Sequence, residues 1–266
     1  MNLAQKRRCR RVPKSIPAAR RQPAPVVLTD DPVDWWFDVG EGTQAWNGEH
    51  PPDPHSLVRV RAPKSTAKSR HVPVYAYSTT TGGHIRLESG LEHDLLRELD
   101  RRPEISWLVS QPMRLRLPAK RARRRLEHTP DLLSVDSHGI VTIWDVRATR
   151  RQYDDFKIKA DLTGRASRDL GWRYEVFAGL TRVRKGNLMW LHGFRREPAN
   201  YATRLATIVG DTRITSIGGV LATDDEGGHL TASMWHAVWR GDLLCDLDKH
   251  LSRSTPLLIP PTEASA

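Results

Sequence analysis

Cysteines and long apolar runs are almost absent from this sequence. The only two cysteines, Cys9 and Cys245, lie far apart in unlike contexts, which excludes a disulfide framework and a cysteine-based zinc site. No apolar segment approaches the roughly 18 residues of a membrane-spanning helix, and the arginine-rich start lacks the apolar core of a signal peptide. We therefore expect a soluble intracellular protein with no membrane partner.

Acidic residues are also few relative to basic ones. Asp and Glu number 31 against 42 Lys and Arg, so the 266-residue chain carries a net charge of +11. Such a charge favours a polyanionic partner, because counterion release contributes to the affinity for nucleic acid. Apolar residues make up 38% of the chain, which is enough for one large domain or two small ones. A globular protein that binds nucleic acid is the first expectation.

The first 24 residues contain no acid at all. Their basic residues are interleaved with prolines, a composition typical of a disordered basic arm. A contact with DNA phosphates and a solvated tail without a specific role fit this composition equally well. Residues 25–84 contain proline clusters and no sustained period, so we predict a partly irregular N-terminal extension there. Residues 261–266 form a short tail.

Helical and strand-like periods begin near residue 85. Leucines at helical spacing from Leu87 to Leu99 predict a helix of about 14 residues that ends before Pro103. Residues 107–117 are strand-like around Gln111-Pro112, and residues 120–125 form a basic connection.

A second apolar stripe runs from Ile158 to Leu170. It predicts a helix that is capped by Asp154 or Asp155 and closes at Gly171, and a strand follows at residues 172–177. The order of these elements predicts a mixed sheet flanked by helices, an α/β core over residues 85–180.

The clearest local pattern is a hairpin around a four-residue turn that ends in glycine. If Val135 and Ile140 flank the turn, Asp131 lies across from Trp144, one bulge from direct opposition to Asp145. Arg147 follows Asp145 by two residues and therefore shares its face. We expect two carboxylates and a cation to converge at this end of the hairpin.

The pattern changes after Gly179. Residues 188–194 are strand-like, residues 198–209 are helical, and the spacing of Trp235 and Trp239 predicts a helix that ends at Gly241. We assign both tryptophans to a core rather than to base stacking. With the short apolar runs at 243–247 and 256–259, residues 181–260 suit a smaller C-terminal module of the winged-helix type.

Five short motifs, taken together, resemble the TnsA endonuclease subunit of heteromeric transposases. They are Ser89-Gly90-Leu91-Glu92, Gln111-Pro112, His128-Thr129-Pro130-Asp131, Asp145-Val146-Arg147 and Gly171-Trp172. No single motif is specific, but a chance match of all five in order and spacing is improbable. The resemblance covers roughly residues 85–178, with looser similarity from Trp235 to Leu257. It implies a restriction-endonuclease-like fold of the PD-(D/E)xK superfamily.

The resemblance also implies a catalytic site. Its metal ligands are Glu92, Asp131, Asp145 and the main-chain carbonyl of Val146, and Arg147 stands where the family has lysine. Hard oxygen donors select Mg²⁺ or Mn²⁺ rather than zinc. Arginine stays protonated, so Arg147 can hold a phosphate or stabilise charge but cannot act as a base.

The implied function is hydrolysis of a DNA strand at transposon ends during cut-and-paste transposition. The implied partners are DNA, a TnsB-like integrase and a TnsC-like ATPase, and residues 181–260 are the implied partner-binding module. The implied location is the cytoplasm, in association with the nucleoid. Two other hypotheses keep the fold: a catalytically inactive DNA-binding assembly subunit, and a stand-alone restriction or repair nuclease.

Several site residues also have simpler interpretations. Ser89 and Glu92 satisfy the capping-box rule, in which case Glu88 is the alternative ligand. Asp131 has the simpler interpretation of a strand-initiating residue after proline, and Asp145 with Arg147 that of an exposed ion pair, although the apolar neighbours of Asp145 indicate a largely buried strand. Gln111 either orients a site carboxylate or pairs with the backbone, and His128 either contacts a phosphate or is a polar surface residue.

The basic run that precedes the hairpin has two interpretations as well. It either guides the DNA backbone or forms a solvated loop. Its members are Lys120, Arg121, Arg123, Arg124 and Arg125.

Overall fold

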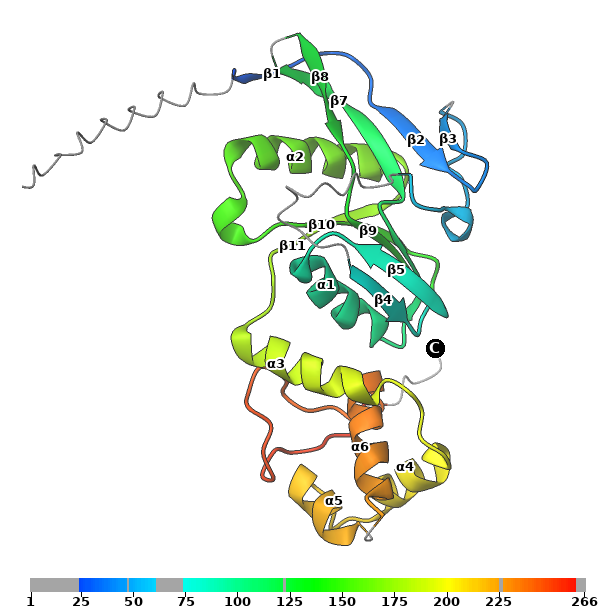
Figure 1. Cartoon of the computed structure of the whole chain (residues 1–266), viewed down its shortest axis with the longest axis vertical. Coiled ribbons are helices and arrows are strands. Elements are labelled where there is room, and N and C mark those ends of the chain that lie inside the picture. The colour runs from blue at the N-terminus through cyan, green and yellow to red at the C-terminus, as the bar shows by residue number, and fades with distance from the viewer. Residues whose placement is uncertain (1–23, 47, 61–73, 122, 225–226, 262–266) are drawn as a thin grey trace, which may run out of the picture.

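The structure is a computed structural model that describes residues 24–46, 48–60, 74–121, 123–224 and 227–261. The basic arm predicted for residues 1–24, apart from Ala24, and the tail beyond residue 261 lie outside the described residues. Layers of secondary structure are stacked along one long axis, with the N-terminal strands at one end and a group of helices at the other (Figure 1). None of the described helices has both the length and the apolar character needed to cross a membrane.

A mixed four-stranded sheet lies at the centre of the chain. Its order is β11 (Arg173–Phe177), β10 (Val141–Val146), β9 (Leu132–Asp136) and β6 (Ile105–Ser110). Strand β9 is antiparallel to both neighbours, whereas β10 and β11 are parallel and are joined through helix α2 (Asp154–Asp169). Four of the five β9 residues are buried, which explains the nearly continuous apolar run. The predicted mixed sheet with flanking helices is confirmed at this level.

A second sheet covers the far side of α2. It contains β1 (Val26–Leu28), β7 (Met113–Arg121), β2 (Asp34–Asp38) and β3 (Thr43–Ala45), and β8 (Arg124–His128) pairs with β7. Residues 25–84, predicted as a partly irregular extension, contribute three of these short strands with irregular segments between them. The basic connection predicted at residues 120–125 is wrong for Lys120, Arg121, Arg124 and Arg125, which lie in β7 and β8, whereas Arg123 lies in the turn that precedes β8.

Strand β7 shows why the prediction failed. Its odd-numbered residues from Met113 to Ala119 have no exposed surface, while the residues between them are basic or proline and half-buried. The strand thus has the period-2 pattern of a half-buried strand, but it continues into a run of arginines that resembles a loop.

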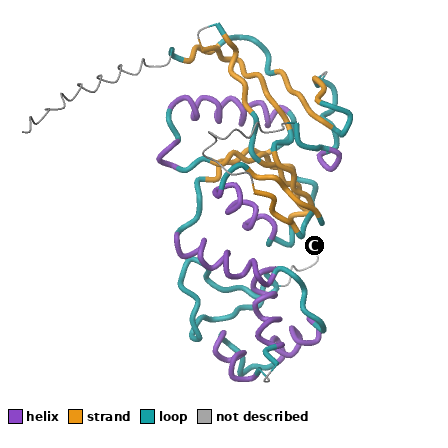
Figure 2. Tube along the Cα trace, viewed as in Figure 1, coloured by secondary structure: helices purple, strands orange, loops and turns teal. Residues whose placement is uncertain are grey.

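Helix α2 is packed between the two sheets (Figures 1 and 2). Its buried Leu162 and Ala166 belong to one apolar cluster with Leu117 of the N-terminal sheet and with Leu133 and Ile143 of the central sheet. The cluster makes the N-terminal strands and the central sheet parts of one core. The predicted cap of α2 is wrong: Tyr153 is the N-cap, without a side-chain bond, and the two aspartates lie in the first turn.

Helix α1 (Gly90–Asp100) covers the other face of the central sheet, beside the hairpin of β4 (Val74–Ser78) and β5 (Gly83–Leu87). Its Leu95 and Leu99 pack in a cluster with Leu108 and Leu132 of that sheet. The helix has 11 residues instead of about 14, because Leu87 belongs to β5.

Four helices form the C-terminal module: α3 (Arg182–Leu191), α4 (Tyr201–Gly210), α5 (Ile217–Thr223) and α6 (His229–Arg240). The predicted strand at 188–194 is wrong, since α3 continues into the 3-10 turn His192–Phe194. The predicted helices α4 and α6 are confirmed, and α6 closes at Gly241 with φ +85°. Two further 3-10 turns span Pro54–Ser56 and Thr149–Arg151.

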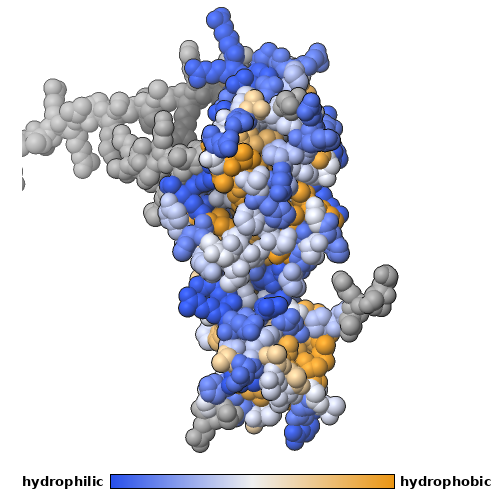
Figure 3. Space-filling view, turned by 90° about the vertical axis from the view of Figure 1, so that its right-hand side faces the viewer, coloured by the Kyte–Doolittle hydropathy of each residue, from blue (hydrophilic) through white to orange (hydrophobic). Residues whose placement is uncertain are grey.

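The two apolar runs that follow α6 pair with each other in the described residues through one isolated bridge, between Leu244 and Leu258, and Pro256 forms a second bridge with Ser216, the N-cap of α5. Apolar residues gather on one side of this module (Figure 3). Its exposed large apolar side chains include those of Leu258 and Ile259. The module contacts α1 through ion pairs of Lys185 with Asp94 and of Arg184 with Glu98.

We expect Leu117→Ala to lower the free energy of unfolding by about 2–5 kcal/mol, because it opens a cavity in the cluster that joins both sheets. Urea unfolding measures the loss. Val27→Ala is the control, since this side chain in neighbouring β1 is 60% exposed and should change stability by less than about 0.5 kcal/mol. Similar losses in both variants would show that α2 does not couple the two sheets.

Candidate functional site

The predicted carboxylates lie at the open end of the β9–β10 hairpin. Val135 pairs with Val141, not with Ile140, so the register is shifted by one residue from the prediction. Leu132 consequently pairs with Trp144, and the continued register places Asp131 opposite Asp145. The two aspartates therefore approach each other from neighbouring strands, as the sequence predicts, by a different pairing.

Asp131 is held in place by β10. Its Oδ2 accepts a hydrogen bond from the Val146 amide at 2.7 Å, and its own amide donates to the Trp144 carbonyl at 2.9 Å. The pKa of Asp131 is raised well above its usual value, mainly by burial and then by the negative charges of Asp145 and Glu92. Three carboxylates thus lie close enough to repel one another.

Asp145 is only 1% exposed and has two donors on one oxygen. Tyr174 of β11 donates to Oδ2 at 2.5 Å, and Nε2 of His128 lies 2.8 Å from the same atom. Burial, followed by the charge of Asp145, raises the pKa of Tyr174, so this hydroxyl remains a neutral donor. The other oxygen, Oδ1, receives no hydrogen bond from the described residues.

A glycine in α2 makes the Tyr174 contact possible. A Cβ placed on Gly164 would lie 3.2 Å from Cδ1 of the Tyr174 ring, closer than an ordinary contact. The ring therefore packs directly on the helix, with its hydroxyl at Asp145.

Glu92 has both oxygens engaged in the cap of α1. The Ser89 hydroxyl donates to Oε1 and the Glu88 amide donates to Oε2, both at 2.7 Å, while the Glu92 amide donates to Ser89 Oγ at 3.2 Å. The Ser89 half of the predicted capping box is present, but the Glu92 carboxylate bonds the Glu88 amide and the Ser89 hydroxyl instead of the amide of the N-cap residue Ser89. Burial is the main cause of the raised pKa of Glu92.

Gln111 contributes through its main chain and not through a bond to a carboxylate. Its amide donates to the Asp131 carbonyl at 2.9 Å, and its side-chain oxygen accepts from Nε and Nη2 of Arg59 at 3.0 and 2.7 Å. Arg59 also pairs with Glu88 at 3.1 Å. Gln111 adopts φ +47°, which is uncommon outside glycine. The backbone turn at Gln111 places its amide against the carbonyl of Asp131.

Arg147 does not join the carboxylates, so the predicted convergence of three side chains is wrong for this residue. It is exposed, its Nε donates to the Arg151 carbonyl at 3.2 Å, and its guanidinium lies 5.5 Å from the Phe156 ring centroid. No ion pair joins it to Asp131 or Asp145 within the described residues. The reason is that β10 ends at Val146, so the strand alternation used to place Arg147 no longer applies.

Lys159 of α2 is the basic residue that lies near Asp145. Its Nζ donates to the Glu127 carbonyl at 2.9 Å. Partial burial is the main cause of its lowered pKa, and the charge of Arg121 acts in the same direction, whereas Asp145 opposes the shift. Sequence reasoning missed Lys159 and Tyr174 because their contacts form across the fold. It also left His128 open between a phosphate contact and a surface position, whereas the structure places its ring at Asp145.

Three members of the basic run are paired with acids. Arg121 pairs with Asp155 of α2, Lys120 with Asp31 at 3.1 Å and Arg125 with Asp34 at 2.9 Å. Arg123 and Arg124 are exposed at the hairpin tip. The run is thus neither a solvated loop nor a uniformly free cationic surface.

The oxygen donors of Asp131 and Asp145 suit a hard divalent cation, which would also relieve their mutual repulsion. Across the described part of the chain, however, no three His, Cys, Asp or Glu side chains lie close enough together to form a metal cluster. A divalent cation would therefore be held by the two aspartates, with water completing its coordination. Glu92 would not be a ligand while its carboxylate is bonded in the cap of α1.

Comparisons of the sequence with models of known families and with curated proteins found no match.

We expect Asp131→Asn to stabilise the metal-free protein near neutral pH. The pKa of Asp131 in the folded state is raised above the usual 3.8. The wild type therefore loses stability as the pH rises from about 3.8 to the folded-state pKa. The variant cannot ionise and avoids this loss. Thermal unfolding in a chelator should give the variant the higher Tm at about pH 7.5, and the difference should shrink towards about pH 4.

The control is Asp161→Asn, which removes a carboxylate that is 56% exposed on α2. It should show no comparable rise in Tm. A Tm for Asp131→Asn at or below that of the wild type at about pH 7.5 would contradict the carboxylate repulsion.

Proposed function

We propose that the chain is a metal-dependent DNA endonuclease that uses Mg²⁺ or Mn²⁺. The observation that carries the proposal is the pair Asp131 and Asp145, brought together from neighbouring strands beside Lys159 and His128. Carboxylate oxygens next to positively charged side chains suit the hydrolysis of a phosphodiester. The carboxylates bind the divalent metal ion, and the positively charged side chains bind the substrate phosphate. The net charge of +11 supports a nucleic acid substrate.

The restriction-endonuclease-like fold belongs to the same proposal. The elements α1, β6, β9, β10, α2 and β11 follow one another in the order helix, three strands, helix, strand, interrupted only by the β7–β8 hairpin. The motifs that resemble TnsA fall on this set: the glutamate at the start of α1, one aspartate before β9 and one within β10. The N-terminal sheet is an addition to it.

The reaction is attack of water on phosphorus with departure of the 3′ oxygen. Asp131 and Asp145 would hold the ion, which when bound supplies an acidified water and neutralises charge on the phosphate. His128 and Tyr174 fix Asp145 and leave its second oxygen free. Arg147 cannot accept the proton of the water because a guanidinium remains protonated.

The biological role follows from the resemblance to TnsA. Under this proposal the chain cuts one DNA strand at each transposon end, and a TnsB-like integrase joins the other strand to the target. The C-terminal module, with exposed apolar side chains such as Leu258 and Ile259, would bind a TnsC-like ATPase. Neighbouring reading frames for an integrase and an ATPase would support this assignment over that of a stand-alone restriction or repair nuclease.

A second candidate is a DNA-binding assembly subunit without catalysis. The observations that favour it are the cap that engages both oxygens of Glu92 and the position of Arg147 away from the carboxylates. Strand nicking with Mg²⁺ or Mn²⁺ in the presence of the partners decides between the two. Normal binding to transposon ends without nicking would establish the binding subunit, and nicking of arbitrary DNA without partners would establish the stand-alone nuclease.

We expect Asp131→Asn and Asp145→Asn each to lower the rate of metal-dependent nicking by at least about 100-fold, because each removes a metal-binding charge. DNA affinity in a chelator should remain within a few-fold of the wild type. A gel assay of a supercoiled plasmid measures nicking, with Asp161→Asn as the matched control. Undiminished nicking by either variant would refute the assignment of the carboxylates.

We expect Arg147→Ala to retain nicking within about tenfold of the wild type, because the guanidinium packs on Phe156 and bonds a carbonyl away from the carboxylates. Arg147→Lys should be at least as active. A loss as large as that of Asp145→Asn would show that Arg147 moves into the site when DNA binds.

A further inference from the structure

A pocket of about 480 Å³ opens beside Asp145, on the side of the N-terminal sheet. Its lining residues are Val60, Arg114, Glu127, His128, Thr129 and Lys159. They come from β7, from the end of β8 and the residue after it, from α2 and from the segment that ends at Val60, so the pocket depends on the packing of the N-terminal sheet on α2. His128 is shared by the pocket and the carboxylate pair, since its ring lines the first and bonds Asp145.

Two cations in this pocket lack a carboxylate partner among the described residues. The Nζ of Lys159 bonds a main-chain carbonyl, and Nε of Arg114 is buried with no hydrogen-bond acceptor. Among the described lining residues the acid is Glu127, which is exposed and pairs with Arg116 at 3.7 Å. Because Lys159 and Arg114 form no ion pair with a carboxylate of the described residues, the pocket is suited to an anion.

Arg114 is also held in position. Trp36 of β2 lies opposite Arg114 in the register, and its ring centroid is 4.9 Å from the Cζ of Arg114 and 4.9 Å from that of Arg116. Stacking on an aromatic ring fixes the plane of a guanidinium and leaves its edge free for hydrogen bonds. The arrangement orients the arginine before a ligand arrives.

We propose that this pocket binds a backbone phosphate of DNA next to the phosphate that is cut, with Lys159 and Arg114 as its cationic ligands. Trp36 is a positioning residue for Arg114. The choice of a DNA phosphate, over a free small anion, rests on the proposed nuclease function, because the pocket adjoins the carboxylates through His128. Contacts of this kind fix the register of the strand without reading its sequence.

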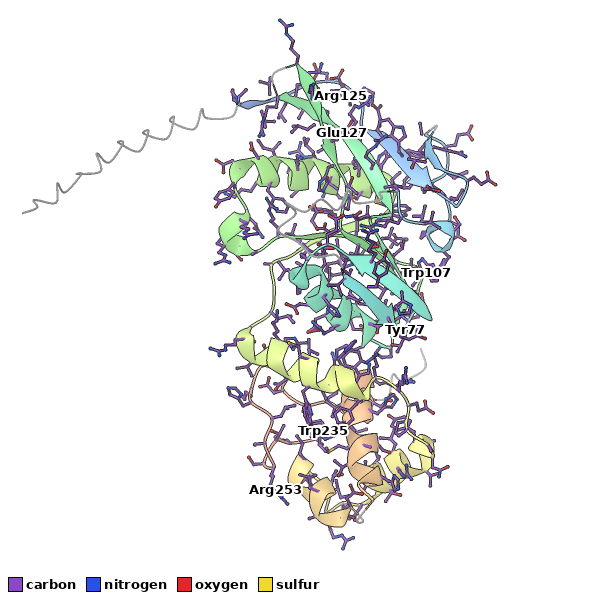
Figure 4. All side chains as sticks on the ribbon, viewed as in Figure 1. Tyr77, Trp107, Arg125, Glu127, Trp235 and Arg253 are labelled. Carbon is purple, nitrogen blue, oxygen red and sulfur yellow. The ribbon has the colours of Figure 1, made fainter. Side chains whose placement is uncertain are left out.

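The N-terminal sheet shows where the DNA strand would continue beyond this pocket. Arg125 and Glu127 lie on β8 at the end of the molecule that carries the N-terminal sheet (Figure 4). A second pocket there, of about 650 Å³, is lined by Arg116, Arg121, Arg124 and Arg125. Glu127 lines both pockets, so they lie next to each other and neighbouring phosphates would meet basic groups along β7 and β8.

The test measures binding of the full-length protein to a fluorescein-labelled duplex in EDTA, by fluorescence anisotropy at several salt concentrations. Each phosphate contact contributes about 0.9 to the slope of log affinity against log salt. Because the pocket holds one phosphate, the double variant Lys159→Gln/Arg114→Gln should reduce the slope by about 0.9, and a fourfold rise in salt should weaken its DNA binding about 3.5-fold less than that of the wild type. The affinity at low salt should fall as well.

The control removes the same two charge types elsewhere. Lys157→Gln lies two residues away on α2 at 65% exposure, and Arg213→Gln lies in the C-terminal module at 84% exposure. This double variant should keep the wild-type slope and affinity. Equal losses in both double variants, or no loss in either, would overturn the pocket as a phosphate site.

Trp36→Leu separates position from charge. It should lower the affinity while leaving the salt slope unchanged, and Trp36→Phe should restore much of the affinity, because the ring and not the charge is altered. An unchanged affinity in Trp36→Leu would remove Trp36 from the proposal. Because all readouts are taken without metal, a protein that never nicks DNA but shows these slopes keeps the phosphate pocket and loses only the nuclease function. Inorganic phosphate at millimolar concentration that competes equally with wild type and double variant would also count against the pocket.

Discussion

The repulsion between Asp131 and Asp145 is the constraint on which the rest of the site depends. Burying two carboxylates at the end of a hairpin is unfavourable, and hydrogen-bond donors to particular oxygens reduce this free-energy cost. The Val146 amide donates to Asp131, whereas His128 and Tyr174 bond Asp145. Each of these donors lies on a different strand, so the central sheet, its order and the helix that supports Tyr174 are all required for the pair to exist. Burial of Asp131, followed by the charges of Asp145 and Glu92, keeps its pKa raised despite these donors.

The second sheet places positive charge beside this pair. Arg114 comes from β7 and Lys159 from α2, and both reach the pocket because a shared apolar cluster binds the N-terminal strands, α2 and the central sheet together. The neighbouring arginines are largely paired with Asp31, Asp34 and Asp155, so the uncompensated cations are few and are located near the carboxylates. Net charge alone would not reveal this distribution, because it counts paired and unpaired groups alike.

The sequence predicted the central α/β arrangement, the hairpin and both aspartates, because each depends on local periods and turn residues. It failed where contacts span the chain. Nothing near Lys159 or Tyr174 indicates that α2 and β11 bring them to Asp145, and a shift of one residue in the pairing of Val135 lies below what a turn pattern resolves. Arg147 was placed by strand alternation one residue beyond the end of β10. The N-terminal strands were missed because short strands with exposed faces lack a sustained apolar period.

Helix α1 has a mechanical consequence for the whole molecule. Its first turn carries Glu92, which lies beside the aspartates. Further along the same helix, which is about 16 Å long, the nearly buried Asp94 and Glu98 form ion pairs with Lys185 and Arg184 of α3. The two ion pairs and the Glu92 cap lie on one helix, so α1 sets the position of α3 relative to the cap. A displacement of the C-terminal helices that kept both ion pairs intact would move the cap as well.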